Sequence, residues 1–300
     1  MVYYMGDIHG NPLPAVFACR QMNMTHEDTL VLLGDVGANY YGDERDVRTK
    51  KSLAKLGPKI LCIHGNHEMR PESITSYSSK VWRGGKVWYE PEHPSLLFAA
   101  DGEVFDLEGI KHLTIGGAYS VDKQYRLERG YGWWADEQPS EEIKAKVEQT
   151  LEQIDWNIDV VLSHTCPFRY EPREAFLPFI DQSTVDDSTE KWLDTIEEKL
   201  AYQYWFCGHW HIEKHIDYTA SVVHDVLHVH GIAPVSAAGI DTIPIHFESH
   251  SVNTRFRGRG NGKCGHGQGL ASVACQRTPG CGVQSVLVGC IVRRIGNGFA

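Results

Sequence analysis

The sequence predicts a layered α/β sandwich that contains parallel strands, and two observations support this. Short apolar runs rich in β-branched or aromatic residues alternate with segments of helical periodicity. The chain has 300 residues, of which 42% are apolar and 23% charged, so it is long enough for one large α/β domain or two small ones. Strands that alternate with helices are typical of such folds.

Five of the apolar runs predict buried strands, because each is short and is stopped by Gly, Ser or His. These runs are residues 2–5, 29–33, 59–63, 159–162 and 204–207. Further short runs predict hairpins or the second half of the sheet. They are residues 87–89, 96–99, 103–105 and 113–115.

Helices are predicted between these runs. Their ranges are 12–22, 44–56, 141–154 and a helix that starts at 187–190. The first has proline in its first turn and places Leu13, Val16 and Phe17 on one face. In the third, Ser140 precedes two glutamates and is the expected N-cap, whereas Asp187 is the expected cap of the fourth. The fourth helix is expected to bury Trp192, Leu193, Ile196 and Leu200.

Each of the five predicted buried strands is followed by a cluster of potential ligands. The clusters are "GDIHG" at 6–10, "GDVGAN" at 34–39, "GNHE" at 65–68, "SHTCP" at 163–167 and "GHWH" at 208–211. In α/β sheets, ligands gather at the carboxyl ends of the strands, so the clusters are expected to converge. A polar turn or a satisfied core histidine is the alternative for any single cluster. Five clusters in this order indicate one site.

The first cluster shows why a metal ion is expected. Asp7 and His9 are two residues apart on an extended segment and so point to the same side, while Gly6 and Gly10 let the backbone turn tightly. Imidazole, carboxylate and amide ligands without thiolate suit Mn, Fe, Zn or Co rather than Mg or Ca. Phosphate ester hydrolysis uses such ions, because a pair of metals about 3.5–4 Å apart activates a bridging water and clamps the displacement.

The five clusters together resemble the signature of the calcineurin-like metallophosphoesterases. That signature reads Asp-x-His, Gly-Asp, Gly-Asn-His-Asp/Glu, His and Gly-His-x-His, and the resemblance covers roughly residues 1–217. The segment 116–140 resembles one found in bacterial and phage members. The resemblance implies a two-layer or four-layer α/β/β/α sandwich with mixed sheets and two metal ions at its edge.

The resemblance also implies a role for each motif residue. The implied ligands are Asp7, His9 and His211 for one metal, Asn66, His164 and His209 for the other, and Asp35 as a bridge between both. His67 would lie beside the scissile phosphate and donate a proton to the leaving oxygen. The implied function is hydrolysis of phosphate esters by a metal-bridging hydroxide. The alternative is a non-catalytic relative that binds metal or a phosphorylated partner without turnover.

The residues expected to contact the substrate differ from those of one branch of the family. Phosphoprotein phosphatases carry Gly-Asp-x-Val-Asp-Arg-Gly, whose arginine grips the phosphate, but Asn39 stands at that position here, which disfavours a dedicated protein phosphatase. Arg70 is a candidate replacement, with a surface arginine as the alternative. The segment 116–140 is expected to be a loop that forms a substrate wall with Tyr119, Asp122, Arg126, Trp133 and Trp134, or else one whose tryptophans cover a hydrophobic edge.

Charge and composition divide the chain near residue 248. Residues 1–248 carry a net charge of −17 and residues 249–300 carry +7, so the acidic body disfavours nucleic acid as a partner. We expect residues 1–248 to form the metallophosphoesterase domain. Residues 249–300 hold eleven of the 29 glycines and are expected to be a disordered or non-native extension.

Other patterns bear on location and on other enzyme classes. The chain has no apolar stretch of about 18 residues and no basic-then-apolar leader, which predicts a cytoplasmic protein without a membrane partner. Eight cysteines without Cys-x-x-Cys pairs predict reduced thiols. The sequence lacks the Cys-x5-Arg pattern of cysteine phosphatases, a P-loop and a Gly-x-Ser-x-Gly elbow.

Overall fold

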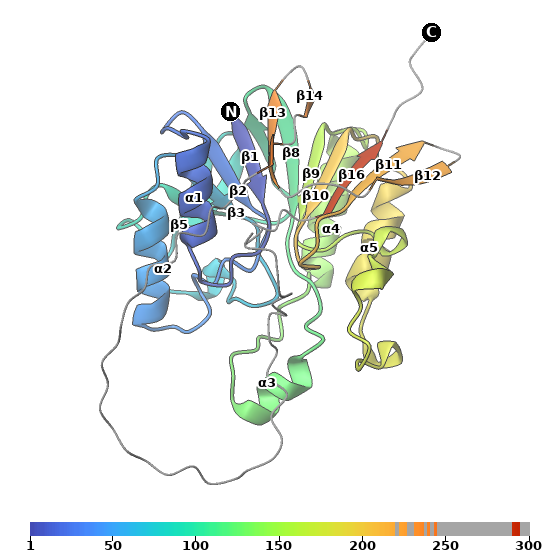
Figure 1. Ribbon diagram of the computed structural model, residues 1–300, viewed down its shortest axis with the longest axis horizontal. Coiled ribbons are helices and arrows are strands. Elements are labelled where there is room, and N and C mark those ends of the chain that lie inside the picture. Colours follow the sequence, from blue (N-terminus) through green and yellow to red (C-terminus); the bar gives the residue numbers. More distant parts are fainter. Residues whose placement is uncertain (220–221, 227–230, 237–238, 241–242, 245–289, 295–300) are drawn as a thin grey trace, which may run out of the picture. The chain divides into compact units, whose positions relative to one another are not determined.

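The computed structural model describes residues 1–219, 222–226, 231–236, 239–240, 243–244 and 290–294, which belong to one compact unit. These residues form two mixed β-sheets and five α-helices (Figure 1). The prediction of an α/β sandwich with mixed sheets is confirmed.

The first sheet has a parallel centre of four strands. These are β1 (Val2–Met5), β2 (Thr29–Leu32), β3 (Lys59–Cys62) and β6 (Leu96–Ala99). At one edge, β5 (Gly85–Tyr89) and β4 (Ser78–Trp82) continue the sheet in antiparallel pairing. On the other side of β1 lie the antiparallel strand β13 (Gly231–Ser236) and its partners β14 (Gly239–Ile240) and β15 (Ile243–Pro244).

The second sheet also has a parallel centre. It consists of β8 (Ile110–Ile115), β9 (Val160–Ser163) and β10 (Tyr204–Cys207). β7 (Val104–Leu107) pairs antiparallel with β8. On the other side of β10 lie β16 (Cys290–Arg294), β11 (His215–Thr219) and β12 (Val222–Val226).

The two sheets pack face to face through a buried apolar layer. Val31 and Leu61 of the first sheet share a core cluster with Leu162 and Phe206 of the second. The ring of Tyr4 on β1 stacks on Phe206 with centroids 4.1 Å apart. Burial of this apolar surface from both sheets stabilises the sandwich and fixes the relative position of their strand ends.

The helices cover the outer faces of the sheets. In Figure 1, α1 (Leu13–Gln21) and α2 (Glu44–Ala54) lie on the outer side of the first sheet. α4 (Glu141–Gln153) and α5 (Ser188–Glu197) cover the second, and their apolar side chains share a buried cluster with β9 and β10. The expected burial of Trp192, Leu193, Ile196 and Leu200 is confirmed.

Two details of the predicted helices differ. The face of α1 predicted from Leu13 and Phe17 is not the buried one, since both side chains are about half exposed and the buried residues are Ala15, Ala18 and Cys19. The cap of α5 also differs from the prediction.

The N-termini of the outer helices α4 and α5 are held differently. Ser140 caps α4 as predicted, because its Oγ accepts from the N–H of Ile143 at 3.3 Å. Asp187 occupies the N-cap position of α5 without capping it, and pairs with Lys191 at 2.7 Å instead. The N–H of Ser188 donates to Oδ1 of Asp186, the residue before Asp187, at 3.0 Å.

The segment 116–140 is not only a loop. It contains α3 (Lys123–Arg129), which ends at Gly130 in the left-handed conformation that favours glycine. α3 was not predicted because its sequence has no buried apolar stripe: Arg126 is its one buried residue. The edge strand β4 was missed for a similar reason, since most of its side chains are exposed or only partly buried.

The predicted extension lies mostly outside the described residues. Of the range 249–300, only β16 is described, and it pairs with β10 and β11. The domain boundary at residue 248 therefore stays a prediction. None of the helices in the described ranges is long and apolar enough to cross a membrane. The side chains of Cys19, Cys62, Cys166 and Cys207 are buried.

Candidate metal centre

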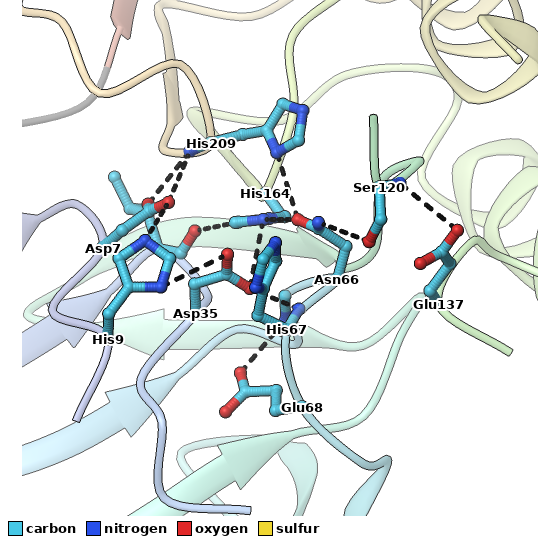
Figure 2. A network of polar contacts seen from close by, with 12 residues as sticks. Asp7, His9, Asp35, Asn66, His67, Glu68, Ser120, Glu137, His164 and His209 are labelled. Atoms are coloured by element: carbon cyan, nitrogen blue, oxygen red, sulfur yellow. Dashed lines mark hydrogen bonds and ion pairs between the residues drawn. The ribbon is translucent and has the colours of Figure 1, made fainter. Parts of the chain in front are cut away.

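Five loops at the carboxyl ends of β1, β2, β3, β9 and β10 carry the predicted metal ligands. Because these strands run parallel within each sheet and the sheets pack face to face, their ends meet at one edge of the sandwich. Figure 2 shows Asp7, His9, Asp35, Asn66, His164 and His209 turned toward one another. The structure thus brings together residues that are up to about two hundred positions apart in the sequence.

Asp7, His9 and His211 form the first group of potential ligands. Asp7 Oδ2 lies 3.2 Å from His211 Nε2 and 3.8 Å from His9 Nε2. The two Nε2 atoms of His9 and His211 are 2.9 Å apart. Two imidazole nitrogens and a carboxylate oxygen that approach this closely can share one cation.

Asn66, His164 and His209 form the second group. Asn66 Oδ1 lies 2.8 Å from His164 Nε2 and 3.1 Å from His209 Nδ1. The other ring nitrogen of His164, Nδ1, is 2.7 Å from the carbonyl oxygen of Leu33, to which it donates. The amide oxygen of Asn66 can only accept, so a proton or a cation must lie between it and His164 Nε2 at this distance.

Asp35 lies between the two groups. Its Oδ2 is 3.9 Å from His9 Nδ1, and its Oδ1 is 3.5 Å from His164 Nε2. Oδ1 also accepts from the backbone N–H of His67 at 2.8 Å. One oxygen of a buried carboxylate therefore faces each group, which is the arrangement that a bridging ligand requires.

The backbone at the centre is strained. His9, Asp35, His209 and His211 have φ angles of 44°, 47°, 68° and 54°. The left-handed region is uncommon outside glycine, costs roughly 1–3 kcal/mol per residue and is concentrated at functional sites. Hydrogen bonds hold it in place: the N–H of His9 donates to Asp35 O at 2.8 Å, and that of His209 to Asp7 Oδ1 at 2.9 Å.

The glycines of the motifs allow this close packing. A Cβ at Gly65 would overlap the carboxylate of Asp35, and one at Gly208 would overlap that of Asp7. A Cβ at Gly34 would collide with the ring of His164. Glycine before the ligand residue is thus required by space as well as by turn geometry.

The surroundings lower the pKa of both carboxylates and of His209, and they raise the pKa of His211 through its hydrogen bond to Asp7. Burial opposes ionisation of Asp7, yet its pKa is lowered because His211 donates to it and nearby imidazoles add positive charge. The pKa of Asp35 is lowered in the same way, chiefly by His164 and His67 against the effect of burial. Burial lowers the pKa of His209 to about 3. Ionised carboxylates and neutral imidazoles are the forms that bind metal.

The donor set fits divalent ions on the evidence of this structure. Three overlapping groups place ligand atoms within 4.8 Å of one another, namely Asp7–His9–His211, His9–Asp35–His67 and Asp7–Asp35–His164. All donors are nitrogen or oxygen, and the facing lone pairs of Asn66 and His164 are unsatisfied without a proton or cation. No other such group occurs among the described residues.

His67 lies at the open side of the centre. Its side chain is 28% exposed, and its ring meets that of His9 edge-on with centroids 5.5 Å apart. Nε2 is 3.8 Å from Asp122 Oδ1. Burial lowers the pKa of His67, with the positive charge of Arg126 adding to this effect and Asp35 opposing it.

A polar network behind Asn66 was not predicted. Asn66 Nδ2 donates to Ser120 Oγ at 2.9 Å, and Arg126 Nη1 donates to the same oxygen at 3.0 Å. The N–H of Ser120 donates to Glu137 Oε1 at 3.2 Å (Figure 2). Glu68, beneath Asp35, accepts from the N–H of Gly65 at 3.1 Å, and burial raises its pKa to about 8.

Sequence signals for this network are weak. Glu68 is the last residue of the "GNHE" cluster, so this motif is a signal that could have singled it out. Ser120 and Glu137 lie in the segment 116–140, where neither periodicity nor a motif singles them out.

The predicted substrate contacts divide into two pairs. Arg126 is connected to the centre through Ser120, and Tyr119 is partly buried next to Ser120 in the chain. Asn39 is only 1% exposed and its Oδ1 accepts from Tyr77 at 2.8 Å. Arg70 is buried in an ion pair with Asp101 at 2.6 Å. The structure therefore does not bring the side chains of Asn39 and Arg70 into the ligand groups.

The alternative prediction, a surface arginine at position 70, also differs from the structure, because Arg70 is buried. Arg70 Nε donates to the backbone carbonyl of Asp136 at 2.9 Å, and the carboxylate of Asp101 also accepts from the N–H of Gly116 at 2.6 Å. Arg70 thus ties the loop after β3 to both ends of the segment 116–140.

Comparison with known proteins identifies the family of this chain. Residues 1–213 match the family model of the calcineurin-like phosphoesterases. The chain belongs to this family. Calcineurin-like phosphoesterases are generally hydrolases that act on phosphoesters and typically bind divalent metals, and the matched range contains all seven predicted ligands.

Solved structures give distant similarities. One is the phosphopantetheinyl hydrolase PptH from Mycobacterium tuberculosis, with 14% identity, a TM-score of 0.42 and coverage of 75% of this chain and 87% of the other. Another is the protein of unknown function AQ665 from Aquifex aeolicus, with 14% identity, a TM-score of 0.25 and coverage of 57% and 81%. No curated protein matches the chain.

Proposed function

We propose that this calcineurin-like phosphoesterase hydrolyses phosphate esters with two divalent ions. The observation that carries the proposal is the convergence of seven ligand side chains from five strand ends, with Asp35 between the two groups. Asp7, His9 and His211 hold one ion in this proposal. Asn66, His164 and His209 hold the other.

The bound ions supply a nucleophile from water at neutral pH and neutralise charge on the attacking and leaving oxygens. The chain supplies the fixed ligand positions. Asp35 offers one oxygen to each group, and its orientation is held by the N–H of His67. Asn66 is oriented by Ser120, which directs the amide oxygen toward His164 and His209.

His67 is the proposed proton donor to the leaving oxygen. It lies next to the ligand groups, is partly exposed, and its backbone N–H rather than its ring is used by Asp35. Asp122, at 3.8 Å from Nε2, can stabilise the protonated imidazole before transfer. The ring is therefore poised to exchange a proton with a bound ester.

Arg126 is the proposed clamp for the phosphate. Its guanidinium is buried, with Nη1 held by Ser120 and 3.8 Å from Asp122 Oδ1, whereas Nε and Nη2 have no hydrogen-bond partner among the described residues. Asp122 lies too far from Nη1 for a hydrogen bond, so the two remaining N–H groups can still bind an anion. This contact replaces the arginine that the sequence lacks at position 39.

Metal removal tests the proposal. Treatment with a chelator should abolish hydrolysis of p-nitrophenyl phosphate and bis(p-nitrophenyl) phosphate, and addition of Mn, Fe, Zn or Co should restore it. Asp35→Asn should lower both activity and bound metal. Asp194→Asn is the matched control, because Asp194 lies on α5 in an ion pair with Arg169, away from the ligand groups. Full activity in the chelated protein contradicts the mechanism.

A further inference from the structure

A cavity of about 730 Å³ lies beside the candidate centre. Much of its wall is aromatic, with one methionine and one arginine. These lining residues include Tyr40, Tyr41, Arg45, Met69, Tyr131 and Trp134.

The cavity and the centre are built from the same loops. Tyr40 follows Asp35 by five residues, and Met69 follows His67 by two. The loop after β2 and the loop after β3 are joined here, because the N–H of Met69 donates to Asn39 O at 2.9 Å. Each loop therefore holds ligand residues at its start and cavity residues a few positions later.

Arg126 connects the cavity wall to the centre. Its guanidinium carbon lies 5.5 Å from the ring centroid of Tyr40 and 5.8 Å from that of Trp134. Its Nη1 donates to Ser120, which in turn holds Asn66. A ligand whose phosphate meets Arg126 at the centre can therefore place a group bonded to that phosphate in the cavity.

The walls suit a flat aromatic ligand. The rings of Tyr40 and Trp134 meet edge to face with centroids 5.5 Å apart, so together they form one corner of the cavity. Tyr41 and Tyr131 leave about half of their side-chain surface exposed. Arg45 lies 3.5 Å above the Tyr41 ring, so a donor group lies at the edge of the cavity.

We infer that this cavity binds the nucleobase of a small nucleotide whose phosphate ester is hydrolysed at the centre. The inference rests on the proposed function and names its substrate class. The volume lies within the range of roughly 300–1,000 Å³ that holds drug-sized ligands, more than a single phenol ring needs. Base stacking on aromatic side chains is worth about 1–3 kcal/mol per base.

The charge of the protein selects a small nucleotide over a polymer. Residues 1–248 carry −17, which repels an extended phosphate backbone. Near the cavity, Arg126 and Arg45 carry positive charge, of which Arg45 is paired with Asp43 at 2.7 Å and Arg126 lies 3.8 Å from Asp122. A single nucleotide meets these local cations without approaching the rest of the acidic surface.

A matched pair of substrates tests this assignment. Adenosine 5′-monophosphate and ribose 5-phosphate share the sugar and the phosphate and differ in the base. The value of kcat/KM should be at least about tenfold higher for the nucleotide, which corresponds to about 1.4 kcal/mol of base binding. The ratio should fall toward one in Tyr41→Ala and in Trp134→Ala, and Trp134→Phe should restore part of it. Equal values for both substrates in the native protein overturn the inference.

Phe179→Ala is the matched control. Phe179 is an exposed aromatic residue, as Tyr41 is, and does not line the cavity. The ratio should be unchanged in this variant. A phosphotyrosine peptide that is hydrolysed with a higher kcat/KM than the nucleotide would assign the cavity to a different ligand and also overturn the inference.

A binding measurement separates the inference from the proposed function. Calorimetry with the metal-loaded His67→Gln protein, whose turnover is expected to be low, should show tighter binding of adenosine 5′-monophosphate than of ribose 5-phosphate. Addition of Tyr41→Ala should weaken the binding of the nucleotide alone. If this preference is found but neither compound is hydrolysed by the native protein, the cavity assignment stands and monoester hydrolysis is contradicted. If both compounds are hydrolysed and no binding preference is found, the cavity assignment is overturned and the proposed function stands.

Discussion

At the scale of single residues, His67 differs from the predicted metal ligands in its surroundings. Its side chain is partly exposed and faces Asp122, whereas His164 is fully buried against Leu33 O and Asn66. We predict that His67→Gln keeps the bound ions and lowers turnover by about 10²–10⁴-fold, the usual contribution of a general acid. Metal content and kcat on an alkyl ester, which is a poor leaving group, measure the two effects.

The control for this prediction is His26→Gln. His26 is 84% exposed and paired with Glu27, so its replacement should change neither quantity. Loss of the metals from the His67 variant would show that the ring is a ligand, as the group His9–Asp35–His67 allows. Native turnover on the alkyl ester would show that no proton from His67 is needed.

Ser120 carries the second prediction at this scale. Its Oγ accepts from Asn66 Nδ2 and from Arg126 Nη1, and a buried donor left without an acceptor costs about 1–3 kcal/mol. Partners that orient a metal ligand typically contribute 10–100-fold to affinity or activity. Ser120→Ala should therefore lower metal affinity and kcat/KM by about tenfold or more.

Metal titration and steady-state kinetics check the Ser120 variant. Ser52→Ala is a suitable control, because Ser52 Oγ donates to the Arg48 carbonyl on the exposed side of α2. A Ser120→Ala protein with native metal affinity and native kcat/KM would contradict the view that Ser120 positions Asn66.

At the scale of elements, the strands and helices were predicted most accurately where the local residue pattern alone indicates the position of the element in the fold. The strands β1, β2, β3, β9 and β10 are short apolar runs that end in ligand clusters, so both their place and their chemistry are local signals. The N-cap Ser140 is likewise read from neighbouring residues. α1 shows the limit, since its buried positions are the small residues Ala15, Ala18 and Cys19 and not its large apolar side chains Leu13 and Phe17.

Local sequence patterns could not predict some contacts of the candidate centre, because these contacts join segments that are far apart in the chain. Ser120 and Arg126 reach Asn66 only because the segment 116–140 folds back over the loop after β3, where Arg70 pairs with Asp101. Sequence spacing does not encode this contact. Asn39 was interpreted from its motif position, but its side chain is buried against Tyr77, which lies just before β4.

The contact between β1 and β8 gives a prediction about pH. His112 Nε2 lies 2.6 Å from the hydroxyl of Tyr4, and Nδ1 lies 2.9 Å from Ile110 O, in the buried space between the sheets. Burial lowers the pKa of His112 from 6.5 to about 4, although Ile110 O and the nearby charges of Asp159 and Asp106 oppose this shift.

The direction in which pH changes the stability follows from the difference between the pKa of His112 in the folded and in the unfolded chain. His112 takes up its proton near pH 6.5 in the unfolded chain and only near pH 4 in the folded chain. Its contribution to the free energy of unfolding is therefore fully present above pH 6.5 and is lost as the pH falls toward 4. The loss should amount to about 3 kcal/mol of unfolding free energy. Urea unfolding between pH 7 and 4 measures it, and His112→Gln should flatten the dependence. The exposed His26→Gln variant should retain it, and equal slopes in all three proteins would contradict the assignment.

At the scale of the whole molecule, the two sheets have separate roles at the centre. β1, β2 and β3 of the first sheet present Asp7, Asp35 and Asn66, and β9 and β10 of the second present His164 and His209. Each proposed ion is held by side chains from both sheets. The face-to-face packing of Val31, Leu162 and their neighbours therefore sets the spacing of the ligands.

The last 52 residues provide the final prediction. All seven proposed ligands, His67 and the residues named for the cavity lie before residue 217, so we propose that a chain ending after Glu248 keeps both ions and keeps kcat/KM within a few-fold of the full chain. β9 still pairs with β10 in this truncated chain, which holds the His209 loop against its neighbours. Metal content, kcat/KM and thermal unfolding measure the outcome. A chain ending after Thr219 also lacks β13, the partner of β1, and should unfold at a lower temperature. If the chain ending after Glu248 loses its ions or becomes insoluble, the pairing of β16 with β10 and β11 is needed for the fold, and the domain extends past residue 248.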